Sequence, residues 1–164
     1  MYDFKPDEAL APAEIYRQLC DAADALTARE KDGVANMANV AALIWEFVPH
    51  LNWAGFYRVI EDGADKELVL GPFVGRPACI RIPMGQGVCG AAAATGETQL
   101  VADVHAFPGH IACDAASQSE VVVPVIRNGE VVAVIDCDSP ELGRFTEDDT
   151  RGLEALAAML SDRI

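Results

Sequence analysis

Two apolar runs on either side of Asn128-Gly129 constrain the fold of this chain more than any other feature. Residues 120–126 and 130–137 are rich in valine and isoleucine, which favour the extended conformation of a strand. Asn-Gly is strongly preferred at the two central positions of a tight hairpin turn, because both positions need a positive φ. The sequence therefore predicts an antiparallel β-hairpin here, within a larger sheet.

Helical patterns lie before, between and after the predicted strands. Apolar residues recur at helical spacing over residues 12–28 and 34–47, and Pro49 ends the second segment. The alanine-rich residues 87–95 predict a short helix packed closely on the sheet. Thr146, followed by three acidic residues, predicts the N-cap of a final helix, since acids in the first turn interact favourably with the helix dipole.

Short extended segments between glycine, proline and aspartate clusters complete the expected sheet. They are residues 51–60, 67–73, 78–82 and 98–101. The order of elements is typical of an α+β domain with helices packed against a mostly antiparallel sheet of about six strands. We expect a single domain over residues 1–164, with the N-terminal helices in residues 1–49 and the sheet core and C-terminal helix in residues 51–164.

Composition excludes several classes of partner. The chain has 164 residues, of which 51% are hydrophobic, enough for one domain with an adequate core. Its net charge of −14 argues against binding to nucleic acid or to an anionic membrane, and no apolar run is long enough to span a bilayer. Residues 1–11 lack the apolar segment of a secretory signal, so we expect a reducing, cytoplasmic location.

Five cysteines are present, and three of them, Cys79, Cys89 and Cys113, fall close together in the sequence. Together with His105 and His110 they could supply zinc ligands, but the spacings lack the paired C-x2–4-C of structural zinc sites, and a C-x-x-C redox motif is also absent. In a reducing compartment, clustered thiols instead favour redox chemistry. A single cysteine taken alone is more often a small buried hydrophobe.

Thiol redox chemistry needs an accessible thiolate and a second thiol that resolves the oxidised product. Cys113 suits the first role, because it lies in residues 103–119, a long segment with no periodic pattern, and such loops are usually functional. Cys79, on a predicted strand, or Cys89, at the start of a predicted helix, could supply the second thiol. Cys20 lies on an amphipathic helical pattern, so we expect it to serve in packing.

Acidic side chains end the predicted hairpin. Strand periodicity places Asp136 and Asp138 on one face, with Cys137 on the other, and Glu120 begins the neighbouring strand. A turn at residues 138–140 would explain Asp138 alone, but burial of Asp136 without a partner is costly. A cluster of acids beside thiols suits recognition of an ammonium group and protonation of a leaving oxygen.

Two aromatic residues share a face of the first predicted strand. Trp53 and Tyr57 have the same strand parity, with Gly55 between them. Core packing is the ordinary explanation for such a pair. The functional alternative is an aromatic wall for a small apolar group, with space left by the glycine.

Six short motifs follow one another in a fixed order: LNWAGFY (residues 51–57), LGPF (70–73), PACIRIP (77–83), GVCG (87–90), DVHAFPGHIACD (103–114) and SPELGRF (139–145). Together they resemble the free methionine-(R)-sulfoxide reductase family, which is built on a GAF domain. The resemblance runs from about residue 35 to the end of the chain, and residues 103–114 form its most specific block.

The resemblance implies an activity and partners. It implies a cytoplasmic, usually dimeric enzyme that reduces the R epimer of free methionine sulfoxide and is recycled by thioredoxin, with no metal or organic cofactor. By motif, Cys113 resembles the nucleophile, Cys79 the main resolving thiol and Cys89 an auxiliary thiol. The alternative is a GAF module that binds a small ligand or senses redox state without turnover.

Substrate-binding residues also follow from the resemblance. Trp53 and Tyr57 match the pocket for the methyl group of the substrate. Three acids match the groups that hold the amino group and assist protonation of the sulfoxide, namely Glu120, Asp136 and Asp138. Two features depart from the family pattern. Cys137 replaces an aliphatic residue, and we expect it to pack on the opposite face, whereas residues 61–67 form a longer segment that is typical of a hairpin tip.

Overall fold

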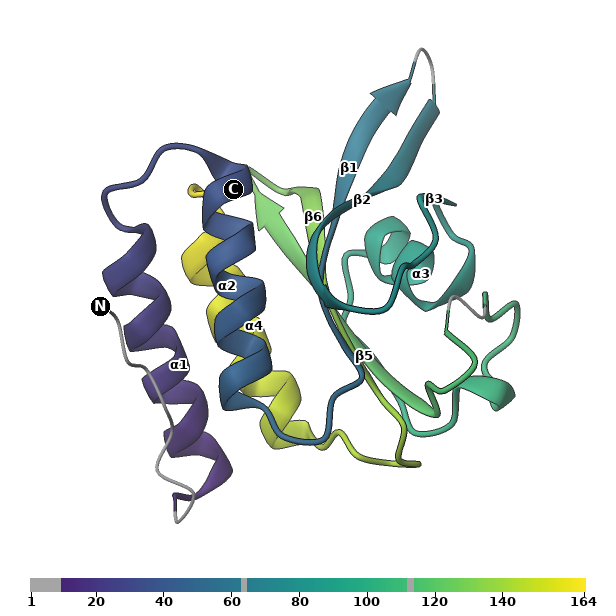
Figure 1. The fold of residues 1–164 in the computed structure, drawn as a ribbon. Coiled ribbons are helices and arrows are strands. Elements are labelled where there is room, and N and C mark those ends of the chain that lie inside the picture. The colour runs from purple at the N-terminus through teal and green to yellow at the C-terminus, as the bar shows by residue number, and fades with distance from the viewer. Residues whose placement is uncertain (1–9, 63–64, 112–113) are drawn as a thin grey trace.

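The structure is a computed structural model that describes residues 10–62, 65–111 and 114–164. In this part of the chain six strands form one sheet in the order β3-β2-β1-β6-β5-β4, with every neighbouring pair antiparallel (Figure 1). The strands are β1 (Trp53–Asp62), β2 (Asp65–Gly75), β3 (Arg81–Pro83), β4 (Gln99–Val101), β5 (Ser119–Arg127) and β6 (Glu130–Ser139). The expected α+β fold with a mostly antiparallel sheet of about six strands is confirmed.

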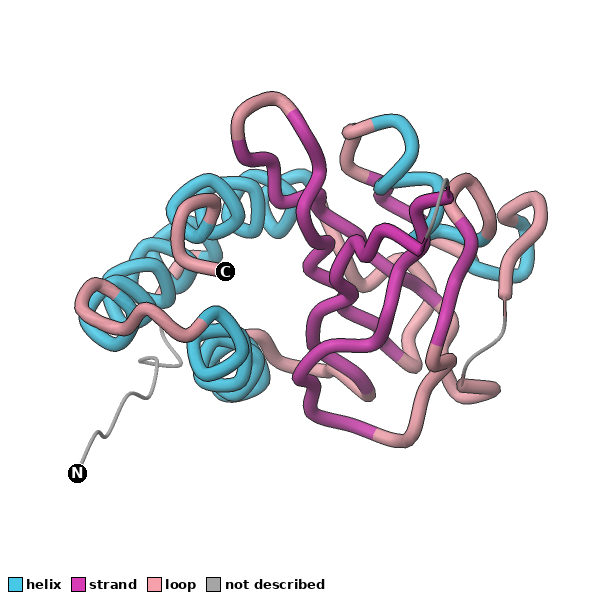
Figure 2. Tube along the Cα trace, turned by 90° about the horizontal axis from the view of Figure 1, so that it is seen from above, coloured by secondary structure: helices cyan, strands magenta, loops and turns pink. Residues whose placement is uncertain are grey.

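Helices cover both faces of the sheet, as Figure 2 shows from above. On one face lie α1 (Pro12–Thr27), α2 (Gly33–Phe47) and α4 (Glu147–Leu160), and on the other lies α3 (Gly87–Thr95). Each face therefore has its own apolar core. None of the helices in the described ranges is long and apolar enough to cross a membrane.

Local sequence explains where the helices begin. Pro12 occupies the first turn of α1, where its missing N–H is not needed. Asp32 caps α2 by accepting a hydrogen bond from the Ala35 N–H at 2.9 Å. Thr146 and Asp149 form a reciprocal capping box at the start of α4, which confirms the predicted N-cap.

The hairpin of β5 and β6 lies near the centre of the sheet, as predicted. Asn128 and Gly129 have φ values of 54° and 82°, the positive values that a tight hairpin turn needs. A bulge between Val125 and Ile126 shifts the register of the two strands by one residue. As a result Glu120 lies opposite Asp138, on the face that carries Asp138, whereas a one-residue slip would turn it to the other face.

The strand predicted over residues 78–82 is shorter in the structure. Only Arg81–Pro83 pairs with β2, and Cys79 lies in the loop before this strand, so its placement on a strand was wrong. Pro77 in this loop cannot donate a backbone hydrogen bond. The carbonyl oxygen of Cys79 accepts a hydrogen bond from the Tyr57 hydroxyl group at 3.0 Å in place of a strand partner.

Candidate active site

A pocket lies on the α3 face of the sheet, where β1, β5 and β6 meet the start of α3 and the segment 103–119. It has an empty volume of about 520 Å³, solvent at its mouth included, within the range usual for small-molecule sites. Six predicted site residues line it, and these are Trp53, Tyr57, Cys89, Glu120, Asp136 and Asp138. The pocket is therefore the candidate active site.

Strand register explains how these side chains meet. Trp53 on β1 lies opposite Asp138 on β6, and Asp138 in turn lies opposite Glu120 on β5. Residues opposite one another in an antiparallel sheet point to the same face, so these three side chains form a row across the sheet. Asp136 lies two residues earlier on β6 and points to the same face, opposite Gly55 of β1.

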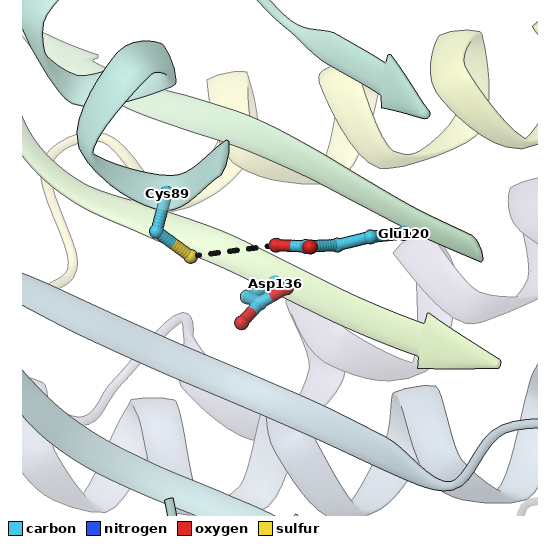
Figure 3. A group of neighbouring side chains, drawn as sticks. All are labelled: Cys89, Glu120 and Asp136. Carbon is cyan, nitrogen blue, oxygen red and sulfur yellow. Dashed lines mark hydrogen bonds between the residues drawn. The ribbon is translucent and has the colours of Figure 1, made fainter. Parts of the chain in front are cut away.

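Cys89 enters the acidic cluster from above the sheet. It is the third residue of α3, and its thiol donates a long hydrogen bond of 3.9 Å to Oε1 of Glu120 (Figure 3). The sulfur of Cys89 and one carboxyl oxygen each of Glu120 and Asp136 lie within 4.8 Å of one another, and all three side chains are buried. Oδ1 of Asp136 is buried without a hydrogen-bond partner.

Burial sets the protonation of this cluster. It raises the pKa of Asp136 from 3.8 to about 7. Burial, and then the negative charge of Asp136, raise the pKa of Glu120 and of Asp138 well above their ordinary values. The pocket therefore favours the protonated form of its carboxyl groups, and Asp136 is about half protonated at pH 7, so the pocket can supply a proton to a bound substrate.

The same environment disfavours Cys89 as a nucleophile. Burial and the nearby charges of Asp136 and Glu120 raise the pKa of the Cys89 thiol well above its ordinary value. Because the thiolate is the reactive form of cysteine, Cys89 stays an unreactive thiol at neutral pH while the pocket is empty.

Aromatic rings form the wall beside the acids. The ring of Trp53 stacks on Tyr57 at 5.9 Å between centroids and on Phe73 at 5.2 Å. The Trp53 indole N–H donates to the carbonyl of Arg76 at 3.1 Å. A Cβ at Gly55 would lie 2.4 Å from the Cβ of Phe73, so the glycine is needed for the close approach of β2, and not to leave open space in the pocket.

The described residues of segment 103–119 line one side of the pocket. Ile111 and Asp114 both line it, and Cys113, the predicted nucleophile, lies outside the described residues. The amide of Asn52 donates to Ser117 Oγ at 3.0 Å and to Asp114 Oδ2 at 3.3 Å, which ties the end of the segment to the start of β1. Gly87, with φ of 61°, lets Ile111 approach the start of α3.

The other cysteines occupy different surroundings. Cys79 is half-buried in the loop before β3, beside the pocket residues Pro77 and Ala78. Cys137 is buried in the core between the sheet and α1, α2 and α4, which confirms that it points away from the acids. Cys20 packs at the edge of that same core.

Three further residues line the pocket. Gln86 and Asp114 have no role in the predicted site, and His110 was considered only as a possible zinc ligand. The rings of His105 and His110 meet edge to face at 6.3 Å, and burial and the charge of His105 lower the pKa of His110, so it is neutral at pH 7. Membership of the 103–114 motif was the signal that could have identified His110 and Asp114.

Known proteins resemble this chain closely. The sequence model of the GAF domain matches residues 35–164. The free methionine-R-sulfoxide reductase of Escherichia coli is 48% identical over 147 residues, which cover 90% of this chain and 87% of the relative. That of Saccharomyces cerevisiae is 44% identical over 153 residues, covering 90% of this chain and 84% of the relative. The X-ray structure of free methionine-R-sulfoxide reductase from Neisseria meningitidis in complex with its substrate is 44% identical and superimposes with a TM-score of 0.91, covering 99% of this chain and 95% of that chain.

Proposed function

Because the chain belongs to the GAF domain family, and within it to the free methionine-R-sulfoxide reductases, we propose that it reduces the R epimer of free methionine sulfoxide to methionine. One observation carries the proposal in this chain. Buried carboxyl groups and an aromatic wall line the same pocket, so that a zwitterionic amino acid with a small apolar end fits both parts.

The acids of the pocket distinguish the free amino acid from a residue in a peptide. Glu120 and Asp136 are both buried, and Oδ1 of Asp136 lacks a partner until a donor arrives. An α-ammonium group supplies both charge and donors, and a charge-assisted hydrogen bond contributes about 1.5–3 kcal/mol. In a peptide this nitrogen is an uncharged amide. The methyl group of the substrate then faces the rings of Trp53 and Tyr57.

The chemistry assigns a separate role to each thiol. The Cys113 sulfur attacks the sulfoxide sulfur, and a carboxylic acid of the pocket protonates the sulfoxide oxygen. The oxygen passes to Cys113 as a sulfenic acid, and methionine leaves with the electron pair it has gained. The Cys79 thiol condenses with this sulfenic acid, forming a disulfide and releasing water. Cys89, held as a thiol, serves as an auxiliary resolving group.

Recycling of the disulfide needs an external dithiol, and we infer that thioredoxin supplies it by thiol–disulfide exchange. Cys79 lies beside Ile80, whose side chain is 71% exposed, so a partner has an apolar contact next to the resolving thiol. This cycle requires a reducing compartment, consistent with the cytoplasm, and no metal or organic cofactor takes part in it.

Domain organisation and assembly complete the proposal. We infer one GAF domain over residues 1–164, because α1 and α2 share a core with β1, β5 and β6. We also infer a homodimer, since α2 exposes two large apolar side chains, Val34 and Trp45, on its outer side. The helices α1, α2 and α4 are the candidate interface.

Turnover assays test the proposal directly. The purified protein should consume free methionine-R-sulfoxide, and leave the S epimer, when thioredoxin, thioredoxin reductase and NADPH are present. Chiral separation of the remaining sulfoxide measures both epimers in one reaction. Tight binding of the R epimer without any methionine formed would instead favour the small-ligand or redox-sensing GAF module.

A further inference from the structure

Three potential metal ligands, one thiol and two carboxyl groups, lie close together in the pocket. The thiol of Cys89 and the carboxyl groups of Glu120 and Asp136 place a donor atom each within 4.8 Å of one another (Figure 3). We propose that these three side chains form a binding site for a single thiophilic divalent cation such as Zn²⁺, and that the cation and the substrate exclude each other. The cation acts as a reversible inhibitor and not as a cofactor.

An unpartnered atom is the second observation that points to a ligand. Asp136 is 5% exposed, and its Oδ1 is buried with no hydrogen-bond partner among the described residues. A buried carboxylate oxygen without a partner is costly, and Asp136 is one of the residues that line the pocket. The site is therefore incomplete as it stands and needs a positively charged group or a donor.

The donor set and its geometry select the kind of cation. Thiolate together with carboxylate suits zinc and similar metals, whereas magnesium and calcium take oxygen ligands alone. Tetrahedral zinc with the usual bond lengths separates its sulfur and oxygen ligands by about 3.6 Å. The Sγ of Cys89 and Oε1 of Glu120 lie 3.9 Å apart, so this pair needs a movement of only a few tenths of an ångström. The ligand atom of Asp136 lies within 4.8 Å of both. Three protein ligands leave the fourth position open to the pocket.

Binding of the cation displaces one proton from the thiol. As the metal–sulfur bond forms, the S–H bond of Cys89 breaks and the proton passes to solvent. The two carboxyl groups bind as carboxylates, and the protons that burial keeps on them also pass to solvent. They are the same groups that we propose hold the ammonium group of the substrate. The competition rests on the proposed function, whereas the cation site itself does not.

Cadmium is a suitable spectroscopic probe, because a cadmium–thiolate bond gives an ultraviolet charge-transfer band. The experiment uses the reduced full chain with Cys79→Ser and Cys113→Ser, so that neither of the proposed redox thiols contributes a ligand. We expect one equivalent of Cd²⁺ or Zn²⁺ to bind, with the band abolished by Cys89→Ser. The isosteric changes Asp136→Asn and Glu120→Gln should keep the fold, keep the thiol, and weaken binding at least tenfold.

The matched control is Cys137→Ala, which removes a buried cysteine next to Asp136 on the opposite face. It should leave the band and the affinity unchanged. Absence of binding at micromolar Cd²⁺ and Zn²⁺, survival of the band in Cys89→Ser, or its loss in Cys137→Ala would each overturn the site.

Competition is measured on the same protein. Free methionine-R-sulfoxide should raise the apparent dissociation constant of Zn²⁺ in proportion to its concentration, and N-acetylmethionine sulfoxide should not. If the active wild-type enzyme bound zinc and sulfoxide independently, the exclusion would be wrong. If the wild-type chain bound the cation through these three residues but reduced no sulfoxide, the proposed function would be overturned and the cation site would stand.

Discussion

Asp136 is a buried carboxyl group whose ionisation we expect to destabilise the substrate-free protein. Its side chain is 5% exposed, and burial raises its pKa from 3.8 to about 7. A carboxyl group whose pKa is higher in the folded state than in the unfolded state lowers stability as pH rises through that interval. Asp136→Asn removes the ionisable group and keeps the shape of the side chain. We therefore predict that this variant is more stable than the wild type at pH 8.

The size of the effect follows from the two pKa values. A rise from 3.8 to about 7, at about 1.36 kcal/mol for each unit of pKa, corresponds to about 4 kcal/mol above pH 7. The asparagine amide is itself buried with incomplete hydrogen bonding, which offsets part of this gain. A net gain of about 2 kcal/mol raises the melting temperature of a chain of this size by about 4–8 °C.

Asp149→Asn is the matched control, because Asp149 is also 5% exposed but fully partnered. Tyr16 and Thr146 donate hydrogen bonds to its two carboxylate oxygens at 2.7–2.8 Å, and Arg144 lies 3.2 Å away. Burial alone would raise the pKa of Asp149, but these hydrogen bonds and the Arg144 charge lower it overall. The amide should therefore destabilise the fold by about 2–4 kcal/mol at pH 8.

Chemical denaturation from pH 4 to pH 8, without substrate, measures both variants against the wild type. At pH 4 the wild-type carboxyl group is protonated in the folded protein and about half protonated in the unfolded chain. Asp136→Asn should therefore be less stable than the wild type there, by about 1–2 kcal/mol, because the cost of the buried amide does not depend on pH. The difference should reverse as pH rises and level off above about pH 7. A loss of stability at pH 8, or a gain that does not change with pH, would refute the reasoning. The deficit of Asp149→Asn should instead shrink on acidification.

Further predictions concern the proposed chemistry and assembly. Cys113→Ser should form no methionine even in a single turnover, whereas Cys79→Ser should release about one equivalent per site before it stalls, as quenched-flow product analysis would show; a full first turnover by Cys113→Ser would reverse the assignment. Asp136→Asn should lower kcat/KM for free methionine-R-sulfoxide by about 10–100-fold but barely change the already low value for the N-acetylated substrate, and equal losses would contradict an ammonium contact. Trp53→Ala should raise KM and destabilise the fold by about 3–5 kcal/mol, since its ring stacks on Tyr57, and an unchanged KM would remove it from the substrate pocket. Sedimentation at micromolar concentration should show a dimer, and a monomer would remove the helical interface without affecting the chemistry.

Period-two alternation and the Asn128-Gly129 turn were sufficient to predict the centre of the sheet. They place Asp136 and Asp138 on one face and Cys137 on the other, and the structure agrees. Local capping and helical periodicity likewise predicted the helices to within one or two residues. These predictions succeeded because each depends on residues close together in the chain.

The meeting of Glu120 with the other acids depends on a feature that the sequence does not reveal. A regular two-residue hairpin would pair Glu120 with Cys137, and the bulge at Val125 and Ile126 moves it opposite Asp138. Cys79 was misplaced for a related reason, because its carbonyl is satisfied by a side chain, Tyr57, and not by a neighbouring strand. Such non-local hydrogen bonds have no signature in the local pattern.

The cluster of Cys89, Glu120 and Asp136 combines three elements, α3, β5 and β6, so no rule of ligand spacing would have found it. The cost of burying these carboxyl groups nevertheless connects the prediction on stability with those on substrate and zinc binding. Carboxyl groups buried this closely destabilise the empty pocket, and a bound cation or ammonium group relieves that cost. Removing one carboxylate should therefore strengthen the fold and weaken binding at the same site. A variant Asp136→Asn that gained stability but bound substrate and zinc as tightly as the wild type would show that this carboxylate contacts neither.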